Sequence, residues 1–236
     1  MSNWREGNQT EIEMSQDVFE SQLVSNLNKL TKVNYTTIKT KINEVITKII
    51  DLEIDTKSLV DILFSKAAEE NMYSDMYSKL LGEIILENKI LNALHTYIGE
   101  KCETFYEKNI NFDIIELEST IEYEELCEIN RNKKLILGGI IFISNLFNYD
   151  LISYHWVKKY YAALVKMTKQ VNKDQIGIYI DTLCAIVSTS GKNLEKYSKE
   201  TFNENFLDAL LDFSQDKNRI KAKYRFKIKD ITDNFQ

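Results

Sequence analysis

Proline is absent from this chain of 236 residues, and glycine occurs only seven times. Average usage of about 5% would give about a dozen prolines. All-β folds need frequent turn-forming residues, so this shortage favours long helices joined by short polar connections. The sequence therefore predicts an all-α protein.

Cysteine and histidine are also scarce, with three and two residues. Cys102, Cys127 and Cys184 are odd in number and form no C-x-x-C pair, which argues against a disulfide framework and a zinc site. His95 and His155 have no neighbours at metal-ligand spacing, and we expect both to be partly buried side chains. No Ser–His–Asp or Cys–His pairing is suggested by spacing. We predict no catalytic residues, no metal and no cofactor.

A long hydrophobic run is missing as well. The longest, residues 135–147, contains two glycines, a serine and an asparagine. Because a bilayer span needs about 20 apolar residues, we expect a buried helix there and no membrane insertion. Residues 1–22 are polar and show no secretory signal. The net charge of −6 argues mildly against nucleic-acid binding over the whole surface, although a local basic patch remains compatible with it.

What the chain does have is apolar residues at helical spacing. One stripe has the spacing i, i+4, i+8 and i+11, and a second follows it: Phe19, Leu23, Leu27 and Leu30, then Ile38, Ile42, Val45, Ile46 and Ile49. Further helices are expected over residues 57–69, 72–88, 90–108, 119–148, 152–169, 173–188, 198–214 and 217–232, with a loop over 109–121. The short connections make neighbouring helices antiparallel.

Helices of about 15 residues in about five antiparallel pairs are typical of a HEAT-repeat solenoid, in which each pair buries a face on the next. A globular helical bundle is the alternative, because no clean repeat occurs at a fixed period. We expect residues 1–14 to be a flexible N-terminal arm containing Trp4, and residues 15–236 to be a single helical domain.

Several blocks of sequence follow one another in a definite order. They are Ile54-Asp55-Thr56, an F-x-K-A helix end at 64–67, the acidic pair Glu69 and Glu70, aromatic Tyr73 and Tyr77, a G-x-I-x-F-I-x-x-L-F run at 138–147 after Lys133 and Lys134, and G-K-N-L-E at 191–195. Gly138 and Gly139 would let two helices approach closely. In order and spacing, these blocks resemble the middle domain of eukaryotic translation initiation factor 4 gamma, where the last block is a turn after the fourth repeat.

The basic C-terminal segment, residues 217–230, alternates basic and apolar residues. A strict period of two indicates a half-buried strand, but a lone strand in a helical chain has nothing to pair with. On a helix, Ile220, Tyr224, Ile228 and Ile231 would form a buried stripe, and Phe226 would lie about 200° around from Tyr224. The helix would then stack like charges at Lys217, Lys221, Arg225 and Lys229, each pair costing about 0.2–0.5 kcal/mol.

The resemblance implies partner-binding residues in this segment. The family carries an R-F pair and, four residues on, an aspartate that contact a helicase, and Arg225, Phe226 and Asp230 match that spacing. It also implies helicase contacts by Trp4, Lys192 and Tyr197, although the family has its aromatic residue where this chain has Lys196. The alternative for Phe226 is a single exposed aromatic on a solvated face.

The resemblance implies a non-catalytic, cytoplasmic and monomeric scaffold of translation initiation. It would bind and activate a DEAD-box RNA helicase similar to initiation factor 4A and support mRNA recruitment. The cap-binder motif Y-x-x-x-x-L is missing, so a cap-binding protein would need another surface. Abundant Asn, Ile and Lys indicate an AT-rich genome, such as that of a protist or a large DNA virus, in which case the site of action is the host cytoplasm.

Two alternatives stay open. The first is an RNA-binding helical module that uses the basic segment, namely Lys217, Arg219, Lys221, Lys223, Lys227 and Lys229, with mRNA as the partner. The second is a scaffold of a sister branch with the same fold, acting in nonsense-mediated decay or splicing.

Overall fold

The computed structural model describes residues 15–109, 123–173 and 176–235, and every regular element in that part of the chain is helical. The predicted all-α class is thereby confirmed. The chain forms two compact units, with the boundary between Leu59 and Val60 inside α3 (Lys57–Glu69). The predicted arm, residues 1–14, and most of the loop predicted over 109–121 lie outside the described residues. The single-domain organisation stays a prediction.

The first unit is built on α1 (Gln16–Leu27) and α2 (Tyr35–Asp51), which pack against each other. Both predicted stripes are buried at Phe19, Leu23, Leu27, Leu30, Ile38, Ile42, Ile46 and Ile49. The connection between the helices is held by Asn34, whose Oδ1 accepts from the Thr31 amide at 2.7 Å and whose Nδ2 donates to the Lys29 carbonyl at 2.7 Å. A side-chain amide therefore fixes a turn that contains neither glycine nor proline.

The end of α2 uses glutamate where glycine is usual. Glu53 has φ of 54°, while the amide of Ile54 donates to the Ile49 carbonyl at 2.9 Å and that of Glu53 to the Ile50 carbonyl at 3.1 Å. This is the Schellman pattern, whose left-handed residue is most often glycine because a Cβ is disfavoured there. Asp150, with φ of 57°, occupies the equivalent place after α6. Scarcity of glycine thus leaves strain at two helix ends.

Replacing Glu53 with glycine should raise the free energy of unfolding by about 1 kcal/mol, because the left-handed conformation costs an L residue roughly that much. The same chemical change at exposed Glu44, in the middle of α2, should lower it by about 0.5–1 kcal/mol. Urea unfolding of both variants shows whether each substitution raises or lowers the free energy of unfolding. If both changes destabilise equally, the strain at Glu53 is absent.

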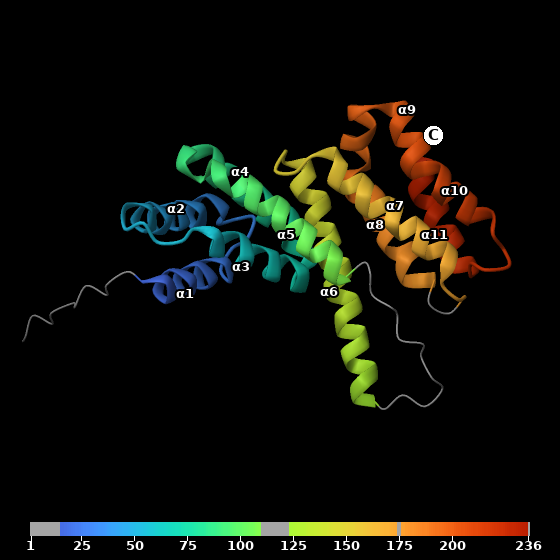
Figure 1. Ribbon diagram of the computed structural model, residues 1–236, viewed down its shortest axis with the longest axis horizontal. Helices are drawn as coiled ribbons and strands as arrows, with labels where there is room; N and C mark the ends of the chain where they lie inside the picture. The colour runs from blue at the N-terminus through green and yellow to red at the C-terminus, as the bar shows by residue number, and fades with distance from the viewer. Residues whose placement is uncertain (1–14, 110–122, 174–175, 236) are drawn as a thin grey trace, which may run out of the picture. The chain divides into compact units, whose positions relative to one another are not determined.

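The second unit contains the remaining helices (Figure 1). In chain order they are η1 (Asn71–Tyr73), α4 (Ser74–Glu87), η2 (Lys89–Ala93), α5 (Leu94–Asn109), α6 (Tyr123–Asn148), α7 (Tyr154–Gln170), α8 (Ile176–Tyr197), α9 (Lys199–Phe202), the π-helical turn η3 (Asn203–Leu207), α10 (Asp208–Gln215), α11 (Ala222–Thr232) and η4 (Asp233–Phe235). None of the helices in the described ranges is long and apolar enough to cross a membrane.

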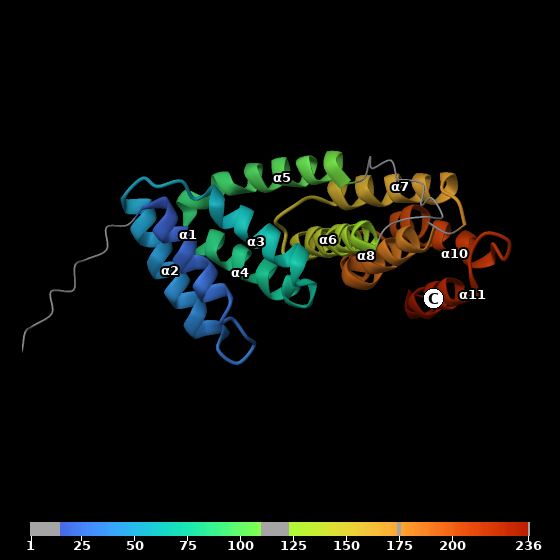
Figure 2. The ribbon, with the colours of Figure 1, turned by 90° about the horizontal axis from the view of Figure 1, so that it is seen from below.

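These helices lie in two layers. α4 packs on α6, α6 on α8, and α8 on α11, which makes one row. α5 and α7 form the other layer, seen above α6 and α8 in Figure 2. The largest fully buried side chains of this unit are Tyr77, Phe142, Tyr160, Tyr161, Phe202 and Phe206.

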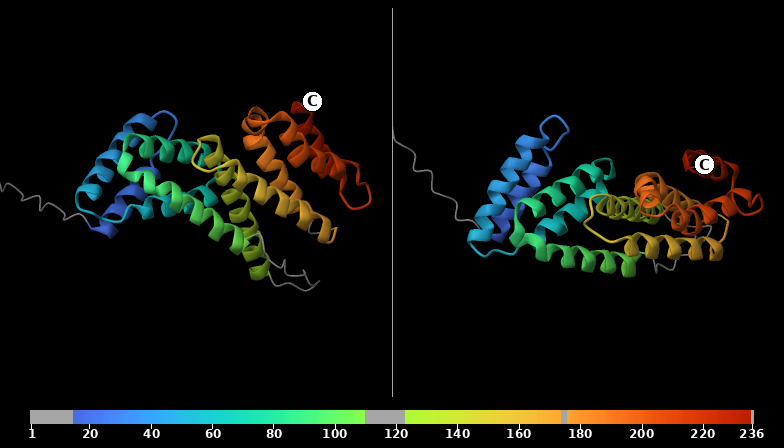
Figure 3. Two further views of the ribbon diagram at one scale, coloured as in Figure 1. Left: turned by 45° about the horizontal axis from the view of Figure 1, so that its top comes forward. Right: turned by 90° about the horizontal axis from the view of Figure 1, so that it is seen from above.

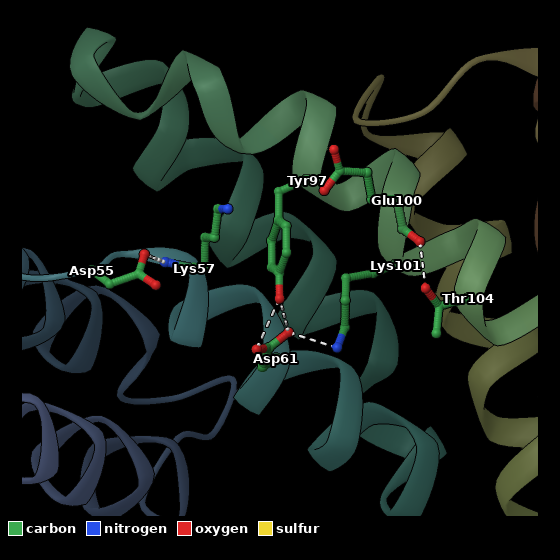
Figure 4. Close-up of polar contacts among 7 residues, drawn as sticks. All are labelled: Asp55, Lys57, Asp61, Tyr97, Glu100, Lys101 and Thr104. Carbon is green, nitrogen blue, oxygen red and sulfur yellow. Dashed lines mark hydrogen bonds and ion pairs between the residues drawn. The ribbon is translucent and has the colours of Figure 1, made fainter.

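A polar cluster ties α3 to α5 at the surface. The Tyr97 hydroxyl donates to both oxygens of Asp61 at 2.9 and 3.0 Å, and Lys101 Nζ lies 2.8 Å from Oδ1 of the same carboxylate (Figure 4). Just before α3, Asp55 of the Ile54-Asp55-Thr56 block accepts from the Lys57 amide at 2.9 Å. Residues 54–56 are non-helical, and the aspartate satisfies the first backbone amide of α3.

Two predicted boundaries near the C-terminus are wrong. The helix expected over 173–188 runs to Tyr197, so residues 191–195 lie inside α8 and are no turn. Gly191 serves close packing there, because a Cβ on it would lie 2.5 Å from Cζ of Phe235. The helix expected over 217–232 starts at Ala222, because Oδ1 of Asp216 accepts from the amides of Asn218 at 3.1 Å and Arg219 at 2.9 Å and holds a turn.

α9, η3 and α10 form one continuous helical run, which agrees with the helix predicted over 198–214. Its π-helical turn accepts a hydrogen bond from another helix, since the hydroxyl of buried Tyr161 on α7 donates to the Phe206 carbonyl at 2.5 Å. In both views of Figure 3 the red α11 follows this run and lies beside α10. α11 is therefore held between α10 and α8.

Candidate functional site

α11 carries the three residues matched to the R-F motif, with Phe226 and Asp230 exposed on its outer face. Phe226 is 67% exposed, whereas Ile228, two positions later, is 0% exposed. In a strand these two side chains would share a face, but on a helix they lie about 200° apart. A helix over residues 222–232, with Phe226 turned to solvent, is confirmed. Of the expected buried stripe, Ile220 and Ile228 are buried, whereas Tyr224 and Ile231 are only half-buried.

The inner face of α11 is fixed on α8. Tyr224 covers Gly177, where a Cβ would lie 2.5 Å from Cζ of the tyrosine ring, and Lys227 Nζ lies 2.6 Å from Oδ1 of Asp181. Past the end of α11, the Phe235 ring packs on Gly191 and meets Phe202 edge-on at 5.1 Å. Contacts at three successive levels of α8 make α11 parallel to it. The orientation of the outer face is therefore set by packing.

Phe226 follows Arg225 in sequence and precedes Asp230 by one helical turn. Asp230 is exposed and one helical turn further along the same face, since side chains at i and i+4 are neighbours. Arg225 is half-buried, and its Nε is enclosed with no hydrogen-bond partner among the described residues. A ring with charges of both signs beside it suits a polar protein surface, because aromatic and arginine residues dominate binding energy at interfaces.

The other residues predicted to bind a helicase do not join this face. Lys192 and Tyr197 are both exposed near the C-terminal end of α8. Asp181, beside α11, and Tyr197 are 16 positions apart on that helix, which is about 24 Å at 1.5 Å per residue. Trp4 lies outside the described residues.

Tyr197 has a neighbour that sequence reasoning missed. Its ring stacks on that of Tyr154, at the start of α7, with centroids 4.9 Å apart and an interplanar angle of 9°. The two residues are 43 positions apart, and no local pattern could have paired them. The exposed Tyr197 ring is thus held in place by tertiary structure.

The residues proposed for RNA binding lie in different local environments. Arg219 Nη2 donates to the carbonyls of Thr168 and Val171, each at 3.0 Å, and so satisfies the end of α7. Lys227 is paired with Asp181, and Lys223 Nζ lies 4.6 Å above the Tyr224 ring. Lys217, Lys221 and Lys229 are exposed. Because Lys217 and Lys221 both precede the first residue of α11, the predicted row of four like charges is shortened to Arg225 and Lys229, and Arg219 has a structural role.

Cysteine and histidine contribute no evident chemistry. Burial raises the pKa of the Cys102 thiol to about 12, with a smaller effect from Glu103, and burial likewise raises that of Cys184 to about 12. Both thiols therefore stay protonated at neutral pH and act as small apolar groups. His95 and His155 are exposed, so the expectation that they are partly buried is wrong. In the ranges that the structure covers, no group of three or more metal-binding side chains could hold an ion.

Comparison with known proteins identifies the family to which this chain is similar. The family model described as "MIF4G domain" matches residues 20–236. The chain is 23% identical over 251 residues to the "Probable eukaryotic translation initiation factor 4 gamma homolog" of Vairimorpha ceranae, covering 96% of this chain and 39% of the relative. It is 22% identical over 242 residues to the mouse protein "Eukaryotic translation initiation factor 4 gamma 1", covering 93% of this chain and 14% of the relative.

A third relative is the human "Eukaryotic translation initiation factor 4 gamma 2", which is 23% identical over 223 residues, covering 88% of this chain and 24% of the relative. The chain thus spans well under half the length of these curated relatives. The MIF4G domain is a HEAT-like helical repeat, which confirms the predicted HEAT-type fold over a globular bundle, and the family is non-catalytic. The two-layered helical unit and the match over residues 20–236 together establish that this chain belongs to the MIF4G domain family.

Proposed function

We propose that this chain is a scaffold of translation initiation that binds and activates a DEAD-box RNA helicase similar to initiation factor 4A. The observation that carries the proposal is the exposed Phe226 on a helix whose opposite face is fixed on α8. The descriptions of the relatives support initiation over the sister branches of nonsense-mediated decay and splicing. Such a scaffold acts in the cytoplasm.

The α11 face would bind one lobe of the helicase, with Phe226 entering an apolar pocket on that lobe. Exposed Lys223 and Lys229 beside it would complement an acidic helicase surface and speed encounter. Earlier helices would hold the other lobe. Holding both lobes in a half-open orientation lowers the free-energy cost of closing on ATP and RNA, so the helicase would cycle faster without any catalytic group from the scaffold.

Phe226→Ala should weaken binding to the cognate helicase about tenfold or more, because loss of a buried aromatic anchor at an interface typically has that effect. Leu86→Ala is the matched control, since Leu86 is 81% exposed on α4, away from the proposed face. Affinity is measured by biolayer interferometry with the helicase immobilised.

The ATPase rate of the helicase, followed with RNA present, completes this experiment. We expect stimulation by the unchanged chain and by Leu86→Ala, and reduced stimulation by Phe226→Ala at equal concentration. Equal affinity for the two variants would remove the α11 face from the proposal. Absence of stimulation across candidate helicases of this type would refute the proposed function itself.

A further inference from the structure

Two aromatic rings of the C-terminal segment lie on glycines of α8. A Cβ on Gly177 would be 2.5 Å from Cζ of Tyr224, and a Cβ on Gly191 would be 2.5 Å from Cζ of Phe235. Apolar packing of this kind is non-directional. These contacts therefore set the distance between the segment and α8 more than they set the rotation of α11 about its own axis.

An ion pair lies on the same face of α8, four residues after Gly177. Lys227 Nζ is 2.6 Å from Oδ1 of Asp181, which is the distance of a charge-assisted hydrogen bond and requires a defined geometry. Among the residues that the structure describes, no other ion pair joins α11 to a neighbouring helix. The side chains are 45% and 35% exposed, so the pair adds little to the stability of the fold.

The place of Lys227 on α11 gives this pair a different importance. Successive side chains of a helix are about 100° apart, so Lys227 lies at the edge between exposed Phe226 and buried Ile228. A roll of α11 in either direction would move Lys227 relative to α8 and break the contact with Asp181. The pair therefore holds the rotation in which Phe226 is turned outward.

We infer that Asp181 is a positioning residue for the proposed helicase contact, acting through Lys227 on the orientation of Phe226. The inference rests on the proposed function. Asp181 belongs to α8, so it acts on the ring from a different helix and without touching the helicase. When the pair is removed, α11 also adopts rotations in which Phe226 is turned away. Apparent affinity then falls with the fraction of molecules in the binding orientation.

Asp181→Asn should weaken binding of the full chain to the helicase about three- to fivefold, because a partly exposed ion pair biases an orientation by about that factor. Its urea unfolding curve should stay close to that of the unchanged chain. Glu103→Gln is the matched control, since Glu103 also pairs with a lysine of another helix, Lys159, at 2.7 Å and with similar exposure. The control should leave affinity unchanged in biolayer interferometry with the helicase immobilised.

Two further comparisons separate positioning from direct contact. Asp181→Lys should weaken binding, and adding Lys227→Asp should return affinity to within about twofold of the unchanged chain, because the pair re-forms with its charges exchanged. A helicase group that touched Asp181 would lose its partner in this exchange, and affinity would not return. In a chain that already carries Phe226→Ala, Asp181→Asn should cause no further loss, since the ring that it orients is gone.

Equal affinity of Asp181→Asn and the unchanged chain would overturn the inference and leave the proposed function intact. The same conclusion follows if the charge exchange does not restore binding, or if Glu103→Gln weakens binding as much as Asp181→Asn. An equal loss with and without Phe226 would also overturn it, because Asp181 would then contact the helicase itself. If the unchanged chain binds no helicase of this type, the proposed function fails, and the inference fails with it.

Discussion

Gly138→Ala should lower the free energy of unfolding by about 3 kcal/mol or more. That is a large part of the roughly 5–15 kcal/mol by which native proteins are stable. Gly138 lies where α6 meets α3, and a Cβ on it would overlap the Ala68 carbonyl oxygen and lie 2.8 Å from the carbonyl carbon of Ala68 and 2.9 Å from its Cα. These atoms belong to a helix backbone and cannot rotate away. The whole of α3 or α6 would have to shift.

Gly82→Ala is the matched control. Gly82 is also inside a helix, but a Cβ there would be 3.8 Å from its nearest neighbours, which is ordinary contact. The change should raise stability by about 0.5–1 kcal/mol, because alanine favours helix over glycine. Thermal unfolding followed by circular dichroism compares the two variants. Similar stability for both would mean that α3 and α6 do not approach closely at Gly138.

Ile228→Ala should lower the free energy of unfolding by about 2–5 kcal/mol, whereas Phe226→Ala should change it by no more than about 0.5 kcal/mol. The two residues are separated by one position and carry side chains of comparable hydrophobicity. Ile228 is 0% exposed against α8 and α10, and Phe226 is 67% exposed. The difference in burial alone produces the difference in stability.

Urea unfolding of both variants measures this contrast. Its result also bears on the nature of the segment, because a strand would place both side chains on one face and give similar effects. Equal destabilisation by the two substitutions would contradict a helical α11. A large effect at Phe226 alone would place that ring in the core and remove it as a partner contact.

Much of the fold follows from local spacing. The stripes Phe19–Leu27 and Ile38–Ile49 are buried as their i, i+4 pattern predicts, because a helix brings such residues onto one face whatever lies opposite. Gly138 was also predicted to allow a close approach, and the structure places it on the backbone of Ala68. The sequence did not reveal which helix would come close, since that partner is 70 positions away.

Helix ends were less predictable, because they depend on contacts elsewhere in the chain. Gly191 was expected in a turn, yet it stays in α8 and accommodates the ring of Phe235. A helix was expected to start at residue 217, but the Asp216 carboxylate holds a turn and Arg219 reaches the end of α7. In both cases a tertiary contact outweighs local propensity, which amounts to less than about 1 kcal/mol per residue.

In the candidate site, too, features within one helix were predictable, whereas contacts between helices were not. Phe226 and Asp230 were identified through the family resemblance, which rests on residues close together in sequence, and the outward position of Phe226 followed from the apolar stripe expected beside it. Tyr154 and Tyr197, and the amides of Asn148 and Asn193, come together from separate helices. Amino-acid order fixed the faces of individual helices, since side chains within a few residues sense the same turn geometry. Only the packed structure decided which faces meet, because contact between distant segments depends on complementary shape and hydrogen bonding that no local pattern records.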